Sequence, residues 1–108
     1  MAGLPIVRVS ILRMSAELYP RIQDDLTAAQ AVLEPGLRAT PGWTDFLAGA
    51  DPATNSMTNV SLWRSLEEAQ QMDRFEPMLE LGRRYVAEGV AFERPIMNYA
   101  TLWRLQRP

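Results

Sequence analysis

Two polar pairs that alternate with apolar residues are the positions in this chain best placed to do chemistry. Arg8 and Ser10 lie within one β-branched segment, and Asn59 and Ser61 lie within another. Side chains two positions apart on a strand share one face of a sheet, so each pair points in one direction. A buried guanidinium needs an anion or several acceptors. Arg8 therefore either binds an anionic ligand or pairs with a carboxylate such as Asp45.

The residue types that the chain lacks exclude whole classes of mechanism. It contains no His and no Cys, and all eleven of its basic residues are Arg. Thiolate nucleophiles, disulfides, imidazole bases, haem ligation through imidazole and Schiff bases on Lys are therefore excluded. We expect no metal centre and no cofactor. Any catalysis must rest on carboxylate, guanidinium, aromatic, hydroxyl and amide side chains, or on a substrate that is itself reactive.

The composition is that of one soluble domain, which we place at residues 1–108. Apolar residues make up 47% of the chain, the net charge is −2, and no apolar run is long enough for a membrane span. Without a basic field, the protein has no electrostatic reason to bind nucleic acid or an acidic membrane. The first six residues lack the pattern of a signal peptide, so we expect a cytoplasmic protein. The exclusive use of Arg over Lys is typical of a GC-rich bacterial genome.

Hydrophobic periodicity predicts the elements that must hold these side chains. Alternation of β-branched residues indicates strands, and apolar residues at helical spacing indicate helices. Pro35-Gly36 and Gly89 are expected to end two helices, and residues 51–55 are expected to form a turn. Ser65 and Glu68 form a capping box at the start of a short helix. The predicted strands are 5–14, 43–50, 56–63 and 95–105, and the predicted helices are 15–34, 65–72 and 77–88. Pro20 is an alternative start for the first helix, because proline is favoured in a first turn.

The order of these elements, β-α-β-β-α-α-β, predicts the architecture. We expect an α+β fold with a ferredoxin-like, four-stranded antiparallel sheet and its helices on one face. The first and third strands should lie side by side at the centre of that sheet. The two polar pairs would then be neighbours.

The two faces of the predicted sheet differ in character. The face expected against the helices is the drier one and consists of Val7, Val9, Ile11, Val60 and Leu62. The other face is expected to carry Ile6, Arg8, Ser10, Leu12, Asn59, Ser61 and Trp63. The last strand adds to it either Met97, Tyr99, Thr101 and Trp103 or Asn98, Ala100, Leu102 and Arg104. We favour the first set, because Ala100 and Leu102 suit the helix side. This second face is too apolar to be left in water and too polar for an ordinary core. We therefore expect a homodimer that pairs these faces around a pocket for a small apolar or aromatic molecule. The alternative is that the polar residues lie at the wet rim of a dimer interface.

Two stretches resemble the antibiotic biosynthesis monooxygenase family. They are Pro41-Gly42-Trp43, at the entry to the second strand, and residues 60–69, where a Trp is followed by a capped helix. The resemblance extends over roughly residues 5–105 and implies the dimeric α+β barrel fold. It is more specific for the fold than for the reaction, because the superfamily includes quinone-forming monooxygenases, haem degraders, isomerases and dehydratases.

The resemblance also implies roles for particular residues. Family members that oxidise polyketide phenols without a cofactor carry an Asn four residues before that Trp, and Asn59 and Trp63 have this spacing, which implies that both are catalytic. The substrate-binding residues that we expect beside them are Arg8, Ser10, Ser61, Tyr99 and Trp103. The alternatives are a hydrogen-bonded strand residue for Asn59 and a core anchor for Trp63. The chain departs from those enzymes at Ala69 and Gln70, where they have a Tyr, and the absence of His excludes the haem-degrading branch.

These observations favour a cofactor-independent monooxygenase, an oxidoreductase that acts on a small aromatic or enolisable substrate. A phenolate or dienolate can itself give an electron to dioxygen, so the protein need only hold the anion and stabilise developing charge. The alternatives are a non-catalytic protein that binds a small ligand, and a structural homodimer or partner-binding domain without an activity of its own.

Overall fold

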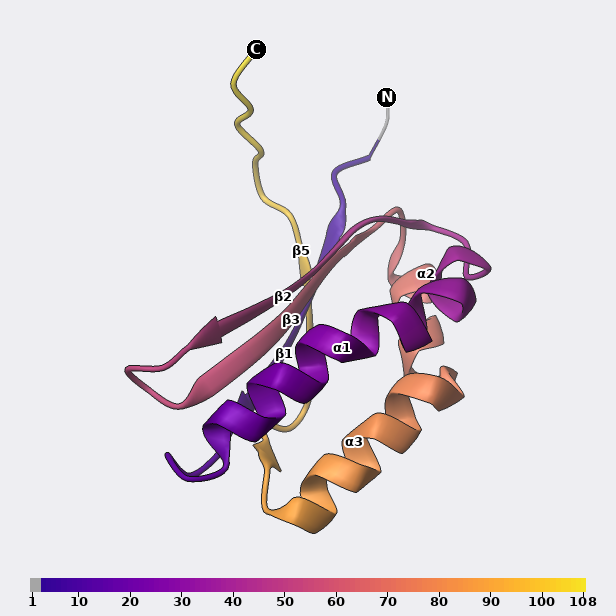
Figure 1. Ribbon diagram of the computed structural model, residues 1–108. Helices are drawn as coiled ribbons and strands as arrows, with labels where there is room; N and C mark the ends of the chain where they lie inside the picture. Colours follow the sequence, from indigo (N-terminus) through magenta and orange to yellow (C-terminus); the bar gives the residue numbers. More distant parts are fainter. Residues whose placement is uncertain (1–2) are drawn as a thin grey trace.

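The computed structural model describes residues 3–108, so the first two residues of the predicted domain lie outside it. The chain forms an antiparallel sheet with helices packed against one of its faces (Figure 1). In chain order the elements are β1 (Ile6–Arg13), α1 (Tyr19–Arg38), β2 (Trp43–Asp51), β3 (Ser56–Trp63), α2 (Leu66–Ala69), η1 (Gln70–Arg74), α3 (Glu76–Glu88), β4 (Ala91–Phe92) and β5 (Met97–Ala100). This is an α+β protein, as the sequence predicts.

The strands are ordered β2-β3-β1-β4, and β5 also pairs with β1. β4 and β5 lie one after the other along the same edge of β1, so five strands occupy four positions. The prediction of one strand over 95–105 is wrong at both ends. Pro95 has no N–H to donate and interrupts the edge after Phe92. The chain leaves the sheet after Ala100 because its partner on β1, Ile6, is the first residue of that strand.

Helix α1 ends four residues later than the sequence predicts, and it begins at Tyr19, next to the alternative start at Pro20. Pro20 lies in its first turn, where the missing N–H would have no helical partner. Pro35 lies inside the helix instead of ending it. The helix continues because Leu33 and Leu37 remain buried on its inner side, and this burial outweighs one lost backbone hydrogen bond on the exposed side. Gly36 permits the close packing there, since a Cβ on it would lie 2.8 Å from the ring of Phe75.

The helices that follow β3 agree closely with the sequence. Ser65 caps α2, because its hydroxyl oxygen accepts a hydrogen bond from the backbone N–H of Glu68 at 3.1 Å. α3 is followed by Gly89, whose φ of 112° is the left-handed conformation that a C-terminal cap requires. None of the helices within residues 3–108 is long and apolar enough to cross a membrane.

The helices cover the opposite face of the sheet from the one that the sequence predicts. The covered face carries Ile6, Arg8, Ser10 and Leu12 of β1, and Met57, Asn59, Ser61 and Trp63 of β3. The uncovered face carries Val7, Val9, Ile11, Val60 and Leu62, which are only partly buried. The prediction failed because it matched the driest face to the helices of the same chain. Helices can cover polar residues when these are paired or line a cavity.

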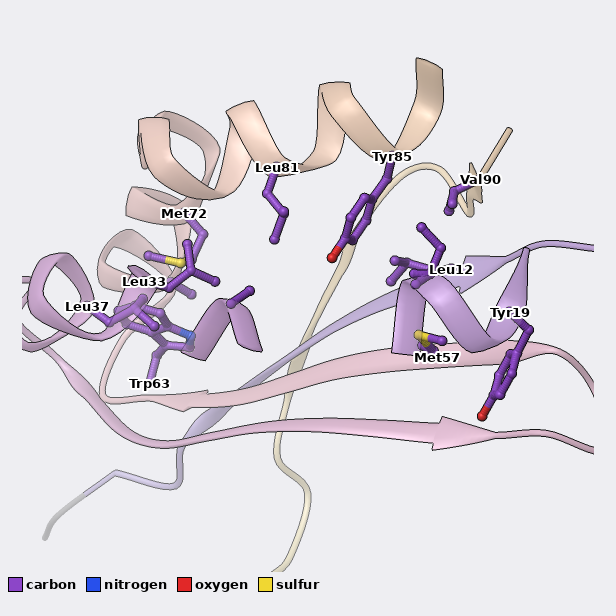
Figure 2. Packing of buried hydrophobic residues seen from close by; sticks show 13 residues of the cluster. Leu12, Tyr19, Leu33, Leu37, Met57, Trp63, Met72, Leu81, Tyr85 and Val90 are labelled. Carbon is purple, nitrogen blue, oxygen red and sulfur yellow. The ribbon is translucent and has the colours of Figure 1, made fainter. Parts of the chain in front are cut away.

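The core beneath the helices falls into two groups of side chains (Figure 2). Leu33, Leu37, Trp63 and Met72 gather at one end, and Leu12, Tyr85 and Val90 gather towards the other. Along β3, Trp63 and Met57 lie near the two ends, and Ser61 and Asn59 lie between them. The polar residues of the sheet therefore occupy the stretch between two apolar clusters.

Candidate functional site

A cavity of about 470 Å³ lies between the covered face of the sheet and helix α3. This volume is in the range of small-molecule sites. The sheet forms its floor, α3 forms its roof, and Met72 and Asp73 of η1 form part of its side. Arg94 and Ile96, from the connection between β4 and β5, complete the wall. A single chain builds this cavity, whereas the sequence predicts a pocket enclosed by two copies.

Four polar residues form the centre of the cavity floor. Arg8 stands opposite Ser61, and Ser10 stands opposite Asn59, on the adjacent strands β1 and β3. The prediction that the two polar pairs are neighbours is thus confirmed. Side chains directly opposite each other on antiparallel strands have their Cβ atoms about 5 Å apart. A ligand of one ring can therefore contact several of these groups at once.

Arg8 is held by partners from two other elements. Its side chain is 8% exposed, Nη2 donates to Oδ1 of Asp73 at 2.8 Å, and Nη1 donates to Oδ1 of Asn98 at 3.2 Å. The alternative pairing with Asp45 is wrong, because Asp45 stands opposite Leu62 on the uncovered face. The side chain of Asp73 is 58% exposed, so water can solvate that carboxylate if an anionic ligand takes its place on the guanidinium.

The other polar groups of the floor differ in whether they are already engaged. Nε1 of Trp63 donates to Oγ of Ser61 at 2.7 Å. Within residues 3–108, neither the side-chain amide of Asn59 nor the hydroxyl of Ser10 makes a hydrogen bond, and both line the cavity. Trp63 is fully buried and does not line the cavity. It serves as a core anchor that orients Ser61, and Asn59 is the group that can meet a ligand.

Tyr85 of α3 lines the roof but is not a general base. Its Oη donates to Oδ2 of Asp25 at 2.5 Å, and Nη2 of Arg84 donates to the same oxygen at 3.1 Å. Burial, and then the hydrogen bond to Asp25, raise the pKa of Tyr85 well above its ordinary value. The phenol therefore remains protonated at neutral pH, and its bond to Asp25 ties α3 to α1.

Two of the predicted substrate-binding residues lie away from the cavity. Tyr99 stands opposite Val7 on the uncovered face and is 51% exposed, and Trp103 lies beyond β5 and is 76% exposed. Asn98, which belongs to the alternative set of residues for the last strand, is the residue of β5 that stands opposite Arg8. Alternation within a strand predicts which of its residues share a face. It does not predict how that face aligns with a neighbouring strand, which the register decides.

Sequence reasoning missed Asp73 and Phe46 as residues of the site. Asp73 follows Met72, which the sequence places on the buried side of a short helix, and this adjacency was the available signal for a carboxylate at the helix–sheet junction. Phe46 lies on the covered face together with Trp43, although an odd number of positions separates them. A bulge between Trp43 and Asp45 shifts the alternation of β2, which explains the weak periodicity of this strand.

The donors of the cavity suit an anionic oxygen better than a metal ion. On the floor they are one guanidinium, one amide and two hydroxyls. The walls add the guanidinium groups of Arg83 and Arg94 and the phenol of Tyr85, and the rest of the lining is mainly apolar. Over residues 3–108, no three His, Cys, Asp or Glu side chains are grouped so that they could hold a metal ion. The arrangement can bind an apolar ring and hold a negatively charged oxygen at the floor.

Comparison with known proteins bears on the fold alone. No family model and no curated protein matches the chain. The crystal structure of PA3566 from Pseudomonas aeruginosa is similar, with a TM-score of 0.66 over 95% of this chain and 99% of that chain. The two sequences are 15% identical. The likeness supports an α+β domain compatible with a ferredoxin-like fold, formed by nearly the whole chain.

Proposed function

We propose that the protein is a cofactor-independent monooxygenase that oxidises a small aromatic or enolisable molecule in the cavity beneath α3. The observation that carries this proposal is that the amide of Asn59 and the guanidinium of Arg8 lie in the floor of one mainly apolar cavity. The apolar walls suit an aromatic ring, and the two donors suit a phenolate or enolate oxygen. Asn59 would be the catalytic donor, and Arg8, Ser10 and Ser61 would bind the substrate.

The reaction requires little from the protein beyond binding of the anion. The substrate loses a proton to water, and the resulting enolate gives one electron to dioxygen. The two radicals then combine to form a carbon–oxygen bond, and loss of water leaves a carbonyl group. One atom of dioxygen enters the substrate, and the other leaves as water with the two hydrogens of the oxidised carbon. Arg8 and Asn59 would lower the barrier by stabilising the enolate and the developing negative charge.

Oxygen uptake tests this function directly. The protein is incubated with a panel of anthrones and hydroquinones, uptake is followed with an electrode, and the product formed under isotopically labelled dioxygen is analysed by mass spectrometry. An oxidised anthrone should contain one labelled oxygen atom. An uptake rate no higher than that of a double variant, Arg8→Leu with Asn59→Ala, would contradict the proposal.

A non-catalytic ligand-binding protein is the second candidate, and the Arg8–Asp73 pair favours it. The pair neutralises the one cation of the floor before any ligand arrives, and Tyr85 is unable to act as a base. Such a protein would bind a phenolate without consuming oxygen. A dinitrophenol that is ionised at neutral pH is a suitable probe, because its absorbance reports binding. Saturable binding together with no oxygen uptake across the panel would favour this candidate.

We also propose that the protein is a homodimer, paired through the uncovered face. This face is mainly apolar, although it also carries Asp45 and Thr58, and Leu47, Met97 and Tyr99 are 58%, 42% and 51% exposed in the single chain. A continuous apolar face of this kind is unusual on an isolated domain, and a second copy of the same face would cover it. The segment that follows β5 extends away from the helices (Figure 1), and Trp103 in this segment is 76% exposed and available to a second copy.

A further inference from the structure

We infer that a second cavity, beneath α1, extends the ligand site, so that the ligand is an elongated molecule with an anionic ring at one end and a neutral, hydrogen-bonding tail at the other. This inference rests on the proposed ligand site beneath α3. The second cavity has a volume of about 420 Å³ and lies between α1 and the strands β2 and β3. Neither its position nor its lining is apparent from the sequence, because it depends on the angle at which α1 crosses the sheet.

The two cavities meet at four shared side chains. Leu26, Phe46, Asn59 and Met78 line both of them. They come from α1, β2, β3 and α3, one from each element, and all four are only partly buried. Because Asn59 faces both cavities, a ring oxygen bound to it lies at the junction. The remainder of the ligand can then pass between the apolar side chains of Leu26, Phe46 and Met78.

The lining of the second cavity indicates the chemistry of the tail. Its inner part is apolar, with Leu33, Trp43 and Met57 among the lining residues. Its rim is formed by polar residues of α1. The charged groups of that rim are already paired, since Nε of Arg38 donates to Oε2 of Glu34 at 3.0 Å.

The groups left on the rim are neutral amides. Gln23 and Gln30 are exposed residues of α1 that line the second cavity. A side-chain amide both donates and accepts hydrogen bonds, so it suits a hydroxyl or amide group rather than a charge. The tail that fits is therefore apolar where it crosses Phe46 and ends in a neutral polar group at the α1 rim.

Ala48 provides a way to close the second cavity alone. It stands opposite Asn59 on the edge strand β2, it is exposed, and it lines the second cavity but not the first. A Phe at this position suits a strand and would fill the space beside α1. Ala48→Phe should therefore exclude the tail and leave the ring site intact. The matched control is Ala91→Phe, which makes the same change on an exposed residue of β4 outside both cavities.

Two dinitrophenol probes, one unsubstituted and one with a hydroxyalkyl chain on the ring carbon next to the phenolic oxygen, separate the two proposals. The long probe should bind the unmodified protein more tightly than the short one. Ala48→Phe should weaken the long probe by about tenfold, because its chain loses apolar contact, and change the short probe by less than about twofold. Gln30→Trp, which fills the same cavity from the α1 side, should have the same selective effect if Ala48→Phe does not fold.

The possible failures are distinguishable. If the short probe binds and both cavity-filling variants bind the long probe as tightly as the Ala91→Phe control does, the second cavity is not part of the site, while the ring site stands. If neither probe binds the unmodified protein, both the ring site and its extension are overturned. If Ala48→Phe and Gln30→Trp both weaken the two probes equally, the extension is overturned, because filling the second cavity then has no selective effect on the longer ligand.

Discussion

The two faces of the sheet reverse the usual relation between burial and polarity. The covered face holds Arg8, Ser10, Asn59 and Ser61 at its centre, whereas the uncovered face is formed mainly by Val, Ile, Leu and Met side chains. If folding of the single chain were the only requirement, the helices would gain more from covering the apolar face. The comparison shows that the burial of a residue within one chain does not account for surface that a second molecule could cover. The driest surface of a protein can be directed outward, towards a partner.

The covered face tolerates its polar residues because the fold gives each of them a partner or access to the cavity. Arg8 and Ser61 have hydrogen-bonded partners, and Asn59 and Ser10 face the cavity. On the uncovered face, full burial of one Val or Leu side chain is worth about 1.5–3 kcal/mol, so a second copy would recover a considerable stabilisation. The two faces thus have separate roles in our proposals, which are ligand binding for one and dimerisation for the other.

The largest expected effect comes from a charge on the uncovered face. Val60 lies between Val9 and Leu47 in the register of the sheet. Val60→Asp would place an unpaired carboxylate in the dimer interface at a cost of several kcal/mol. Light scattering should give about twice the 12.2 kDa chain mass for the unmodified protein and the mass of one chain for the variant.

The matched control for this change is Val32→Asp, on α1. Val32 is 75% exposed and lies away from the uncovered face, so the same substitution there should leave the dimer intact. A mass of one chain for the unmodified protein at micromolar concentration would remove the dimer proposal. Equal masses for the two variants would show that the interface lies elsewhere.

The next effect concerns the cavity floor. Asn59→Ala removes the donor that the structure leaves unengaged, and it should lower the oxygenase rate about 10- to 1,000-fold, as loss of one oxyanion donor does. Thermal unfolding should change little, because no side-chain hydrogen bond within residues 3–108 is lost. Gln70→Ala, which removes an exposed amide outside both cavities, should leave the rate unchanged. A rate for Asn59→Ala equal to that of this control would remove Asn59 from the mechanism.

Replacement of Arg8, the buried cation, tests whether this residue of the covered face contributes to ligand binding or to the stability of the fold. Arg8→Leu keeps an apolar side chain in the floor and frees Asp73, which water can solvate. The free energy of unfolding should therefore change by no more than about 1 kcal/mol, in either direction. Affinity for the ionised dinitrophenol should fall by about tenfold, because a charged hydrogen bond to the phenolate is lost.

Arg13→Leu is the control for this experiment. Arg13 lies at the end of the same strand, pairs with Glu93 at the surface and does not line the cavity. The Arg13→Leu substitution should leave the free energy of unfolding and the affinity for the dinitrophenol nearly unchanged. Severe destabilisation by Arg8→Leu with unchanged affinity would show that Arg8 has a structural role only.

The features that the sequence predicts well are those that depend on local chemistry. The strand at 56–63, the cap at Ser65 and the left-handed Gly89 follow from alternation, capping and backbone sterics. The pairing of β1 with β3 follows from the order of elements. In contrast, the Arg8–Asp73 contact joins residues 65 positions apart, and no local pattern specifies it. The identity of the covered face depends on how the helices and strands of the whole chain pack together, which alternation within one strand cannot decide.

The smallest effect is expected from a substitution in the helical segment α2–η1, which leaves both faces of the sheet unchanged. Ser65 caps α2, and η1 continues directly from α2 to Asp73, which holds Arg8 in the cavity floor. The hydroxyl of Ser65 accepts the N–H of Glu68 and also donates to its carboxylate at 3.2 Å. Ser65→Ala removes both bonds and should cost about 1 kcal/mol in a denaturant titration. Ser65→Asp, which restores the acceptor, should recover most of that loss.

Because the Ser65→Ala change reaches Arg8 only through η1, affinity for the dinitrophenol should fall less than it does in Arg8→Leu. An equal fall in affinity would show that the cap at Ser65 positions Arg8, so that α2 and η1 hold the ligand site in place as well as covering the sheet.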